Sequence, residues 1–251
     1  MTLFRSNRSA SKETASIPST QPRPSPFLVR RRIPPALSGI SLSKVTVDRT
    51  TPRADVSWLD LSLETGILIP PIDYSALSSF TVIDVETTGL DANTHEIIEV
   101  SALRFKNFQP SELYSLLLRP EKEQHIPTSA SSVNRITMDQ LDGCPCFRLI
   151  SRSFQIFLDP AEIIIGHNLD FDVKYLFYNG ITFDKSKTYL DTLAHSKRLH
   201  KVYRKDLHVP ASHRLEDLCA FYGLDITGFH SSAADCLATG LIFRKMLDEI
   251  R

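Results

Sequence analysis

The segment Phe80-Thr-Val-Ile-Asp-Val-Glu-Thr-Thr-Gly-Leu90 decides how the rest of the chain is interpreted. Its apolar residues predict a short strand over Thr81–Glu86 that is broken at Gly89. Asp84 and Glu86 lie two residues apart, so both carboxylates project from the same face of that strand. Neighbouring carboxylates on a buried strand repel each other and lose hydration, which is costly unless a cation lies between them. Hard oxygen ligands indicate Mg²⁺ or Mn²⁺ rather than zinc.

The sequence around this strand predicts an α/β domain with a mixed central sheet. Runs rich in Ile, Val and Leu predict strands at Glu96–Phe105 and Glu112–Leu118, which form an antiparallel meander with the first strand. The fourth strand, Glu162–Gly166, carries three consecutive isoleucines, as expected for a strand that is covered on both faces. A short strand is expected near Thr188–Leu190. Helices are expected near Phe147–Leu158, Asp170–Phe177, Asp191–His200, Arg214–Tyr222 and Ser231–Ile250.

Two further acidic motifs follow at the starts of predicted helices. Gly166-His-Asn-Leu-Asp-Phe-Asp172 follows the fourth strand, and Phe229-His-Ser-Ser-Ala-Ala-Asp235 opens the last helix. Taken alone, the first acid pair would equally describe a strand end with solvated acids. All three motifs together, in this order, resemble the DEDDh exonucleases, the DnaQ-like family that includes the proofreading epsilon subunit of bacterial DNA polymerase III. The resemblance covers residues 79–250, about two-thirds of the chain.

The resemblance implies a ribonuclease H-like exonuclease fold and a role for each acid. Asp84, Glu86, Asp172 and Asp235 match the family's metal-binding carboxylates, and His230 matches its general base. The spacing from His230 to Asp235 fits the histidine branch of the family, because the tyrosine branch would have a tyrosine four residues before the last aspartate.

The second motif contains two aspartates, and the resemblance selects one of them. The family's aspartate ends the pattern His-Asn-x-x-Phe-Asp, which makes Asp172 the ligand. Asp170 is then expected to be a helix cap or a solvated residue.

The chemistry of phosphodiester hydrolysis supports these roles independently. Two cations about 3.5–4 Å apart serve the attacking and leaving oxygens of an in-line displacement. Four carboxylates neutralise most of the charge of two such ions, and a histidine titrates near working pH, so it can accept the proton of water.

Five other residues are candidates for substrate binding. The resemblance suggests that Thr87, Thr88 and Leu90 contact the terminal nucleotide, with Leu90 wedged beside the base, whereas ordinary turn packing is the alternative. His167 and Asn168 either line the pocket or cap the helix that follows them.

The charges of the chain are segregated although its net charge is zero. Residues 1–53 carry ten Lys and Arg against two acids, whereas residues 54–251 carry nineteen against twenty-seven. The first segment is rich in Ser, Pro and Arg without an apolar period, so we expect a disordered basic tail. The same composition describes an organelle transit peptide, and both interpretations are kept. The basic tail suggests contact with a polyanion or a partner.

Residues 54–78 are expected to be an apolar linker that docks on the domain at 79–251, because Trp58–Ile69 is rich in Leu and Ile. No run of about 18 apolar residues predicts a membrane span. Four scattered cysteines indicate a reduced, intracellular protein, and a cytoplasmic location is expected unless the tail directs import.

The stretch Lys185–Arg214 holds eight basic residues against two acids, which suits a track for a single-stranded backbone, although a solvated helix face is the alternative. We therefore expect a two-metal-ion 3′→5′ exonuclease that releases nucleoside monophosphates from single-stranded or frayed 3′ ends. DNA is the favoured substrate, in replication or repair, with a DNA polymerase or replisome as a possible partner. The alternatives are an RNA-directed member resembling RNase T or oligoribonuclease, an inactive exonuclease-fold binding module, and an adaptor that recruits partners through its tail and carries the nuclease as cargo.

Overall fold

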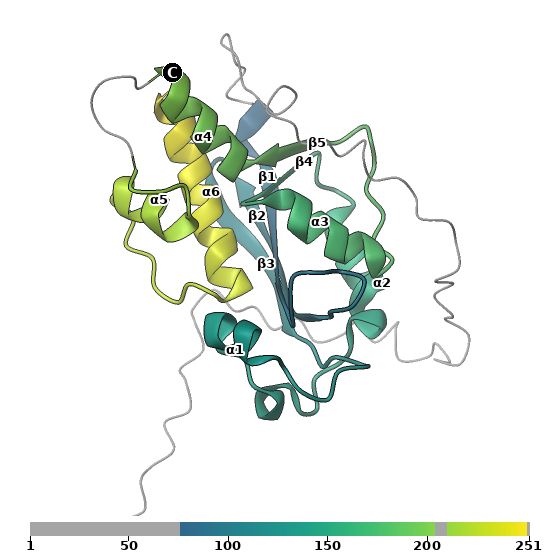
Figure 1. Ribbon diagram of the computed structural model, residues 1–251. Helices are drawn as coiled ribbons and strands as arrows, with labels where there is room; N and C mark the ends of the chain where they lie inside the picture. The colour runs from purple at the N-terminus through teal and green to yellow at the C-terminus, as the bar shows by residue number, and fades with distance from the viewer. Residues whose placement is uncertain (1–75, 204–209, 250–251) are drawn as a thin grey trace, which may run out of the picture.

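The computed structural model describes residues 76–203 and 210–249, and Figure 1 shows them as a central sheet with helices on both faces. The predicted tail, all but the last residues of the predicted linker, and the side chains of residues 200–209 lie outside this part of the chain. Among the described residues, no helix combines the length and the apolar character that a membrane crossing requires.

The sheet has five strands in the order β3-β2-β1-β4-β5, so β1 lies at its centre. β1 pairs antiparallel with β2, and β2 with β3, whereas β4 runs parallel to β1 and β5 runs parallel to β4. This arrangement confirms the predicted mixed sheet with its antiparallel meander. The strands are β1 (Phe80–Thr87), β2 (Ile97–Lys106), β3 (Gln109–Leu117), β4 (Ile163–Gly166) and β5 (Thr188–Asp191).

Six helices and two short 3-10 turns complete the described fold. The two turns, η4 (Ala76–Ser78) and η5 (Met138–Leu141), precede β1 and α2 respectively. The helices are α1 (Thr128–Asn134), α2 (Phe147–Leu158), α3 (Leu169–Tyr178), α4 (Thr192–Tyr203), α5 (Leu215–Phe221) and α6 (Ser232–Glu249).

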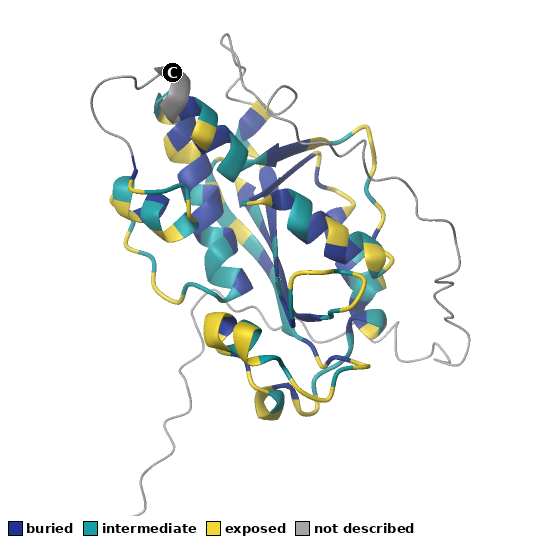
Figure 2. Cartoon of the chain, viewed as in Figure 1, coloured by how far each residue is buried: buried dark blue, intermediate teal, exposed yellow. Residues whose placement is uncertain are grey.

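Alternate residues of β1 belong to two hydrophobic cores, one on each face of the sheet, and Figure 2 shows this central strand mostly buried between them. Ile83 and Val85 pack with residues of α2 and α3. Phe80 and Val82 pack with residues of α6. Since side chains alternate along a strand, the two acids of β1 project toward the face that α6 covers.

The close approach of α6 to the sheet depends on Gly240. A Cβ at this position would lie 2.3 Å from the ring of Phe105 on β2, so any larger residue would push the helix outward. The position of α6 is important because its first turn carries Asp235.

Helix α1 and the start of strand β3 were not predicted. Helix α1 has the sequence Thr-Ser-Ala-Ser-Ser-Val-Asn, which lacks the apolar period of an amphipathic helix, and its Val133 is exposed. Strand β3 begins three residues before the predicted start, because Asn107 and Phe108 both take positive φ and form a tight hairpin turn after β2.

Candidate active site

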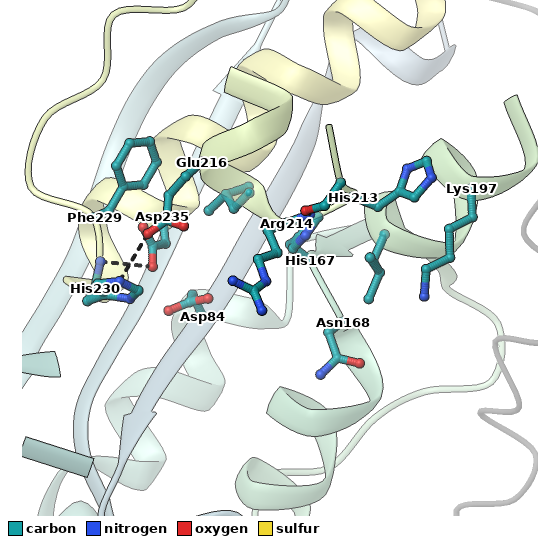
Figure 3. Close-up of a pocket in the computed structure, with 13 residues that line it drawn as sticks. Asp84, His167, Asn168, Lys197, His213, Arg214, Glu216, Phe229, His230 and Asp235 are labelled. Carbon is teal, nitrogen blue, oxygen red and sulfur yellow. Dashed lines mark hydrogen bonds and ion pairs between the residues drawn. The ribbon is translucent and has the colours of Figure 1, made fainter. Parts of the chain in front are cut away.

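Three of the predicted carboxylates meet where α6 begins against the sheet. Asp84 and Glu86 come from β1, and Asp235 comes from the first turn of α6. One oxygen from each lies within 4.8 Å of the other two. Figure 3 shows Asp84 and Asp235 side by side although they lie far apart in the sequence, as the motifs predicted.

The fourth predicted carboxylate, Asp172, reaches β1 from α3. β4 pairs with β1 only at Thr81 and Val82, so Val85, further along β1, has no strand partner on that edge. Asp172 Oδ1 accepts a hydrogen bond from the Val85 N–H at 2.9 Å. The side chain of Asp172 is only 3% exposed, and its charge acts on Asp84.

Burial and mutual repulsion make these acids reluctant to ionise. Burial raises the pKa of Glu86 to about 8 and that of Asp235 to about 7, with nearby carboxylates adding to both. The pKa values of Asp84 and Asp172 are raised well above the usual range, mainly by burial, and for Asp84 also by the charge of Asp172. A cation between the carboxylates would remove both penalties.

The donor set fits a divalent cation. All its ligand atoms are carboxylate oxygens, which suit hard ions such as Mg²⁺. The buried Oδ1 of Asp235 has no hydrogen-bond partner among the described residues. Because buried polar atoms are nearly always satisfied, this oxygen fits the role of a metal ligand.

His230 lies at the entrance to α6 in a left-handed backbone conformation, with φ of 67°. Such a conformation is uncommon for a residue other than glycine and is often retained for function. Its backbone N–H donates to Asp235 Oδ2 at 3.3 Å, and its ring Nε2 lies 3.0 Å from Glu216 Oε1. The predicted base is therefore beside the predicted metal ligands.

A cavity of about 610 Å³ opens at this cluster. Its wall includes Asp84, Asp235 and His230, together with His167 and Asn168. Asn168 is also the N-cap residue of α3, but its side chain makes no capping hydrogen bond. His167 and Asn168 therefore both line the cavity, and their contact with substrate stays a prediction.

Asp170 has the solvated role expected for it. It lies in the first turn of α3, half exposed, where it pairs with Lys174 one turn further along. Asp172, by contrast, turns toward β1.

Thr87, Thr88 and Leu90 lie at the end of β1 and in the turn that follows it, and they do not line this cavity. The carbonyl of Gly89 accepts hydrogen bonds from Thr87 Oγ1 at 2.6 Å and from the Tyr175 hydroxyl at 2.7 Å. Thr88 is fully buried, whereas Leu90 is 88% exposed. The turn is thus held in place while one large apolar side chain points into solvent.

Glu99, a buried carboxylate of β2 near the site, was not predicted from the sequence. It faces Glu86 across the strand pair and is 8% exposed. It accepts hydrogen bonds from the Ser232 N–H at 3.0 Å and from the Ser231 hydroxyl at 3.3 Å. The apolar alternation around Glu99 could have indicated a buried acid, but its partner on β1 follows only from the register of the two strands.

A second carboxylate, Glu216, was also missed. It lies at the start of α5, and its Oε1 is the partner of the His230 ring. Nothing in the sequence around Glu216 distinguishes it from a solvated acid in the first turn of a helix.

The family model described as "Exonuclease" matches residues 81–243. A DNA polymerase III of PolC type from Thermotoga maritima is 29% identical over 177 residues, which cover 69% of this chain and 12% of that protein. The PolC-type enzyme of Bacillus subtilis is also 29% identical, over 191 residues that cover 71% of this chain and 12% of that protein. This chain thus spans about an eighth of the length of the curated relatives that it matches.

Two solved structures illustrate the likeness in fold. Exonuclease I of E. coli in complex with a dT13 oligonucleotide has a TM-score of 0.58 and 21% identity, and the match covers 69% of this chain and 41% of that one. Exonuclease X in complex with 5′ overhanging duplex DNA has a TM-score of 0.50 and 18% identity, and the match covers 67% of this chain and 91% of that one.

Proposed function

This chain belongs to the exonuclease family, and from that membership we propose that it is a two-metal-ion 3′→5′ exonuclease acting on single-stranded or frayed DNA ends. The family match confirms the DnaQ-like resemblance drawn from the three acidic motifs, and the solved neighbours share the fold. The observation that carries the proposal is the group of Asp84, Glu86 and Asp235 oxygens within 4.8 Å beside His230.

The four carboxylates are proposed to hold two Mg²⁺ or Mn²⁺ ions. Asp84 would be among the residues that hold the ions, since the charges of Asp172, Asp235 and Glu86 all act on it. When bound, the ions supply Lewis-acid polarisation of the phosphate and of the attacking water. The protein contributes by keeping the carboxylates buried and oriented, so that little rearrangement accompanies the reaction.

His230 is proposed to take the proton of the attacking water at Nδ1, because its Nε2 lies 3.0 Å from Glu216 Oε1 and carries the hydrogen that this carboxylate accepts. Glu216 would stabilise the imidazolium that results. Glu216 is exposed, so the proton can pass on to solvent.

The turn after β1 is proposed to receive the terminal nucleotide. Leu90 can pack beside the last base because its side chain is free of the core, and Thr87 and Thr88 hold the turn in place. DNA is favoured as the substrate because the matched relatives are DNA polymerases and the solved neighbours are bound to DNA. The PolC relatives also motivate a polymerase or replisome as partner.

Digestion of 5′-labelled substrates tests the proposal. Single-stranded DNA, the matching RNA and a duplex with a mismatched 3′ end would be incubated with Mg²⁺, Mn²⁺ or EDTA. We expect a ladder of products shortened from the 3′ end with either metal and none in EDTA, with single-stranded and frayed DNA cut faster than RNA.

Asp84→Asn is the matched variant, because it keeps the shape of the side chain and removes its charge. Its rate is expected to fall by about 10³-fold or more. A ladder that persists in EDTA or in this variant would refute the mechanism, and faster cleavage of RNA would make the protein an RNA-directed member of the family. Metal-independent binding without cleavage would favour the binding-module alternative.

A further inference from the structure

The cavity beside the acidic cluster has carboxylates at one end and cations at the other. Its carboxylates, Asp84, Asp235 and Glu216, lie with His230 at one end. Two cations also line it, Lys197 from α4 and Arg214 from the residue before α5. In Figure 3, His230 lies on one side of Asp84, and the two cations lie on the other.

Neither cation forms an ion pair with a residue that the structure describes. Within residues 76–203 and 210–249, no carboxylate pairs with Lys197 or Arg214, although three carboxylates line the same cavity. Both side chains are exposed, so they can reach a ligand in the cavity.

The histidines at this end do not add charge. Burial lowers the pKa of His167 to about 4, and burial together with Lys197 lowers the pKa of His213. The positive charge of this end therefore comes from Lys197 and Arg214 alone among the described lining residues.

The two elements that carry these cations are tied together. His213 Nδ1 lies 3.0 Å from Ser196 Oγ on α4, and the Arg214 N–H donates to Ser212 Oγ at 3.1 Å. These contacts fix the backbone that carries Arg214 relative to that of Lys197, so the pair is held by the fold.

A partly buried histidine, His167, completes this connection. The ring of His167 lies 2.9 Å from Thr192 Oγ1 at the start of α4, and it also hydrogen-bonds the backbone of His213. The loop that follows β4, the start of α4 and the segment before α5 therefore form one hydrogen-bonded frame around the cationic end of the cavity.

The position of the cationic end of the cavity relative to the bond that is cut determines which part of a nucleic-acid strand it would contact. The cavity includes only Asp84 from β1, and none of Thr87, Thr88 or Leu90, which we propose to hold the terminal nucleotide. It runs from the carboxylates toward residues of α4 and the segment before α5.

We propose that Lys197 and Arg214 form a subsite for the internucleotide phosphate on the 5′ side of the bond that is cut. A phosphate there would meet two exposed cations that no described carboxylate neutralises, next to the acidic cluster that would hold the metals. This inference rests on the proposed function, and it makes the preferred substrate a polynucleotide rather than a mononucleotide ester.

Two substrates separate the subsite from the chemistry. A single-stranded DNA oligonucleotide carries the upstream phosphate, whereas the p-nitrophenyl ester of thymidine 5′-monophosphate carries only the phosphate that is cut. We expect Arg214→Ala and Lys197→Ala each to raise KM for the oligonucleotide about tenfold. KM for the ester should rise by about twofold or less, so the two effects differ at least about fivefold. Arg214→Lys should recover most of the loss, because it retains the charge.

Binding supplies a readout that does not need cleavage. Anisotropy of a labelled oligonucleotide in EDTA should show weaker affinity for both alanine variants, with the slope of log affinity against log salt reduced by about 0.7 for each contact removed. Lys174→Ala is the matched control, since Lys174 is a half-exposed lysine on α3 that pairs with Asp170 outside the cavity.

The proposal is overturned if the two variants bind the oligonucleotide as the wild type does with an unchanged salt slope, or if they lose oligonucleotide and ester hydrolysis equally. If the wild type cleaves neither substrate in Mg²⁺ or Mn²⁺, the proposed function fails, and the binding experiment in EDTA still decides the subsite.

Discussion

The ionised side chains of Asp84, Glu86 and Asp235 destabilise the fold unless a cation accompanies them. The stability of the metal-free protein should therefore depend on pH in a predictable direction. The pKa of Glu86 is raised to about 8 and that of Asp235 to about 7 in the folded protein. An acid whose pKa is higher in the folded protein than in the unfolded chain holds its proton more tightly when folded. Its contribution to the free energy of unfolding is therefore complete below the unfolded pKa, near pH 4, and is lost as pH rises toward about 8. In EDTA we expect Tm to fall by about 5–10 °C between pH 5 and pH 8, measured by scanning calorimetry.

Magnesium should flatten that decline, and so should Asp84→Asn, because the amide occupies the same space without charge. At pH 8 in EDTA this variant is expected to melt about 3 °C above the wild type although it lacks activity. A metal-free Tm that rises with pH would contradict the electrostatic description of the cluster.

Leu90 offers a test of substrate contact that is independent of folding. Its side chain is 88% exposed, so Leu90→Ala should leave the free energy of unfolding within about 0.5 kcal/mol of the wild type. We expect KM for single-stranded DNA to rise several-fold and cleavage of a paired 3′ end to fall more steeply, since a wedge beside the last base assists fraying. The exposed Leu149 on α2 is the control, and equal effects of Leu149→Ala would rule out a specific role for Leu90.

The orientation of α6 depends on a contact between two elements rather than on the helix itself. Glu99 of β2 accepts the Ser232 N–H at the helix start, in the manner of an N-cap, and Asp235 follows three residues later. Glu99→Ala should cost about 1–2 kcal/mol of stability and weaken Mg²⁺ binding, whereas Glu99→Gln should retain much of both. Isothermal titration with Mg²⁺ measures the second effect. Glu112→Ala on β3 is the control, and the prediction fails if both alanine variants bind Mg²⁺ equally well.

The secondary structure near the site could be predicted because local patterns determine it. The two-residue spacing of Asp84 and Glu86 placed both on one face, and the isoleucine run of β4 indicated a buried strand. The register of β2 against β1 could not be predicted, because alternation specifies a face but not the opposite residue, and so Glu99 was missed. The pairing of His230 with Glu216 depends on how α5 packs on α6, which no local pattern encodes.

The organisation of the whole chain remains a prediction where residues 1–75 are concerned. Deleting residues 1–53 removes ten basic residues and two acids, a net of eight positive charges. If the domain alone carries the activity, kcat and KM on a short oligonucleotide should stay within about twofold of the full chain, while affinity for long DNA at low salt falls about tenfold. Loss of activity on the short oligonucleotide would show that the tail belongs to the catalytic unit, and unchanged affinity for long DNA would remove its proposed contact with polyanions.

The short pairing of β4 with β1 has a consequence for exchange with solvent. The Val85 amide is held by the Asp172 side chain and not by a neighbouring strand, so its protection against deuterium depends on where that carboxylate lies. Its protection factor, followed by NMR, should differ between EDTA and Mg²⁺, while that of Ile83, deep in the same strand, stays constant. One backbone proton at the centre of the sheet should therefore report the state of the carboxylate that we propose to bind metal.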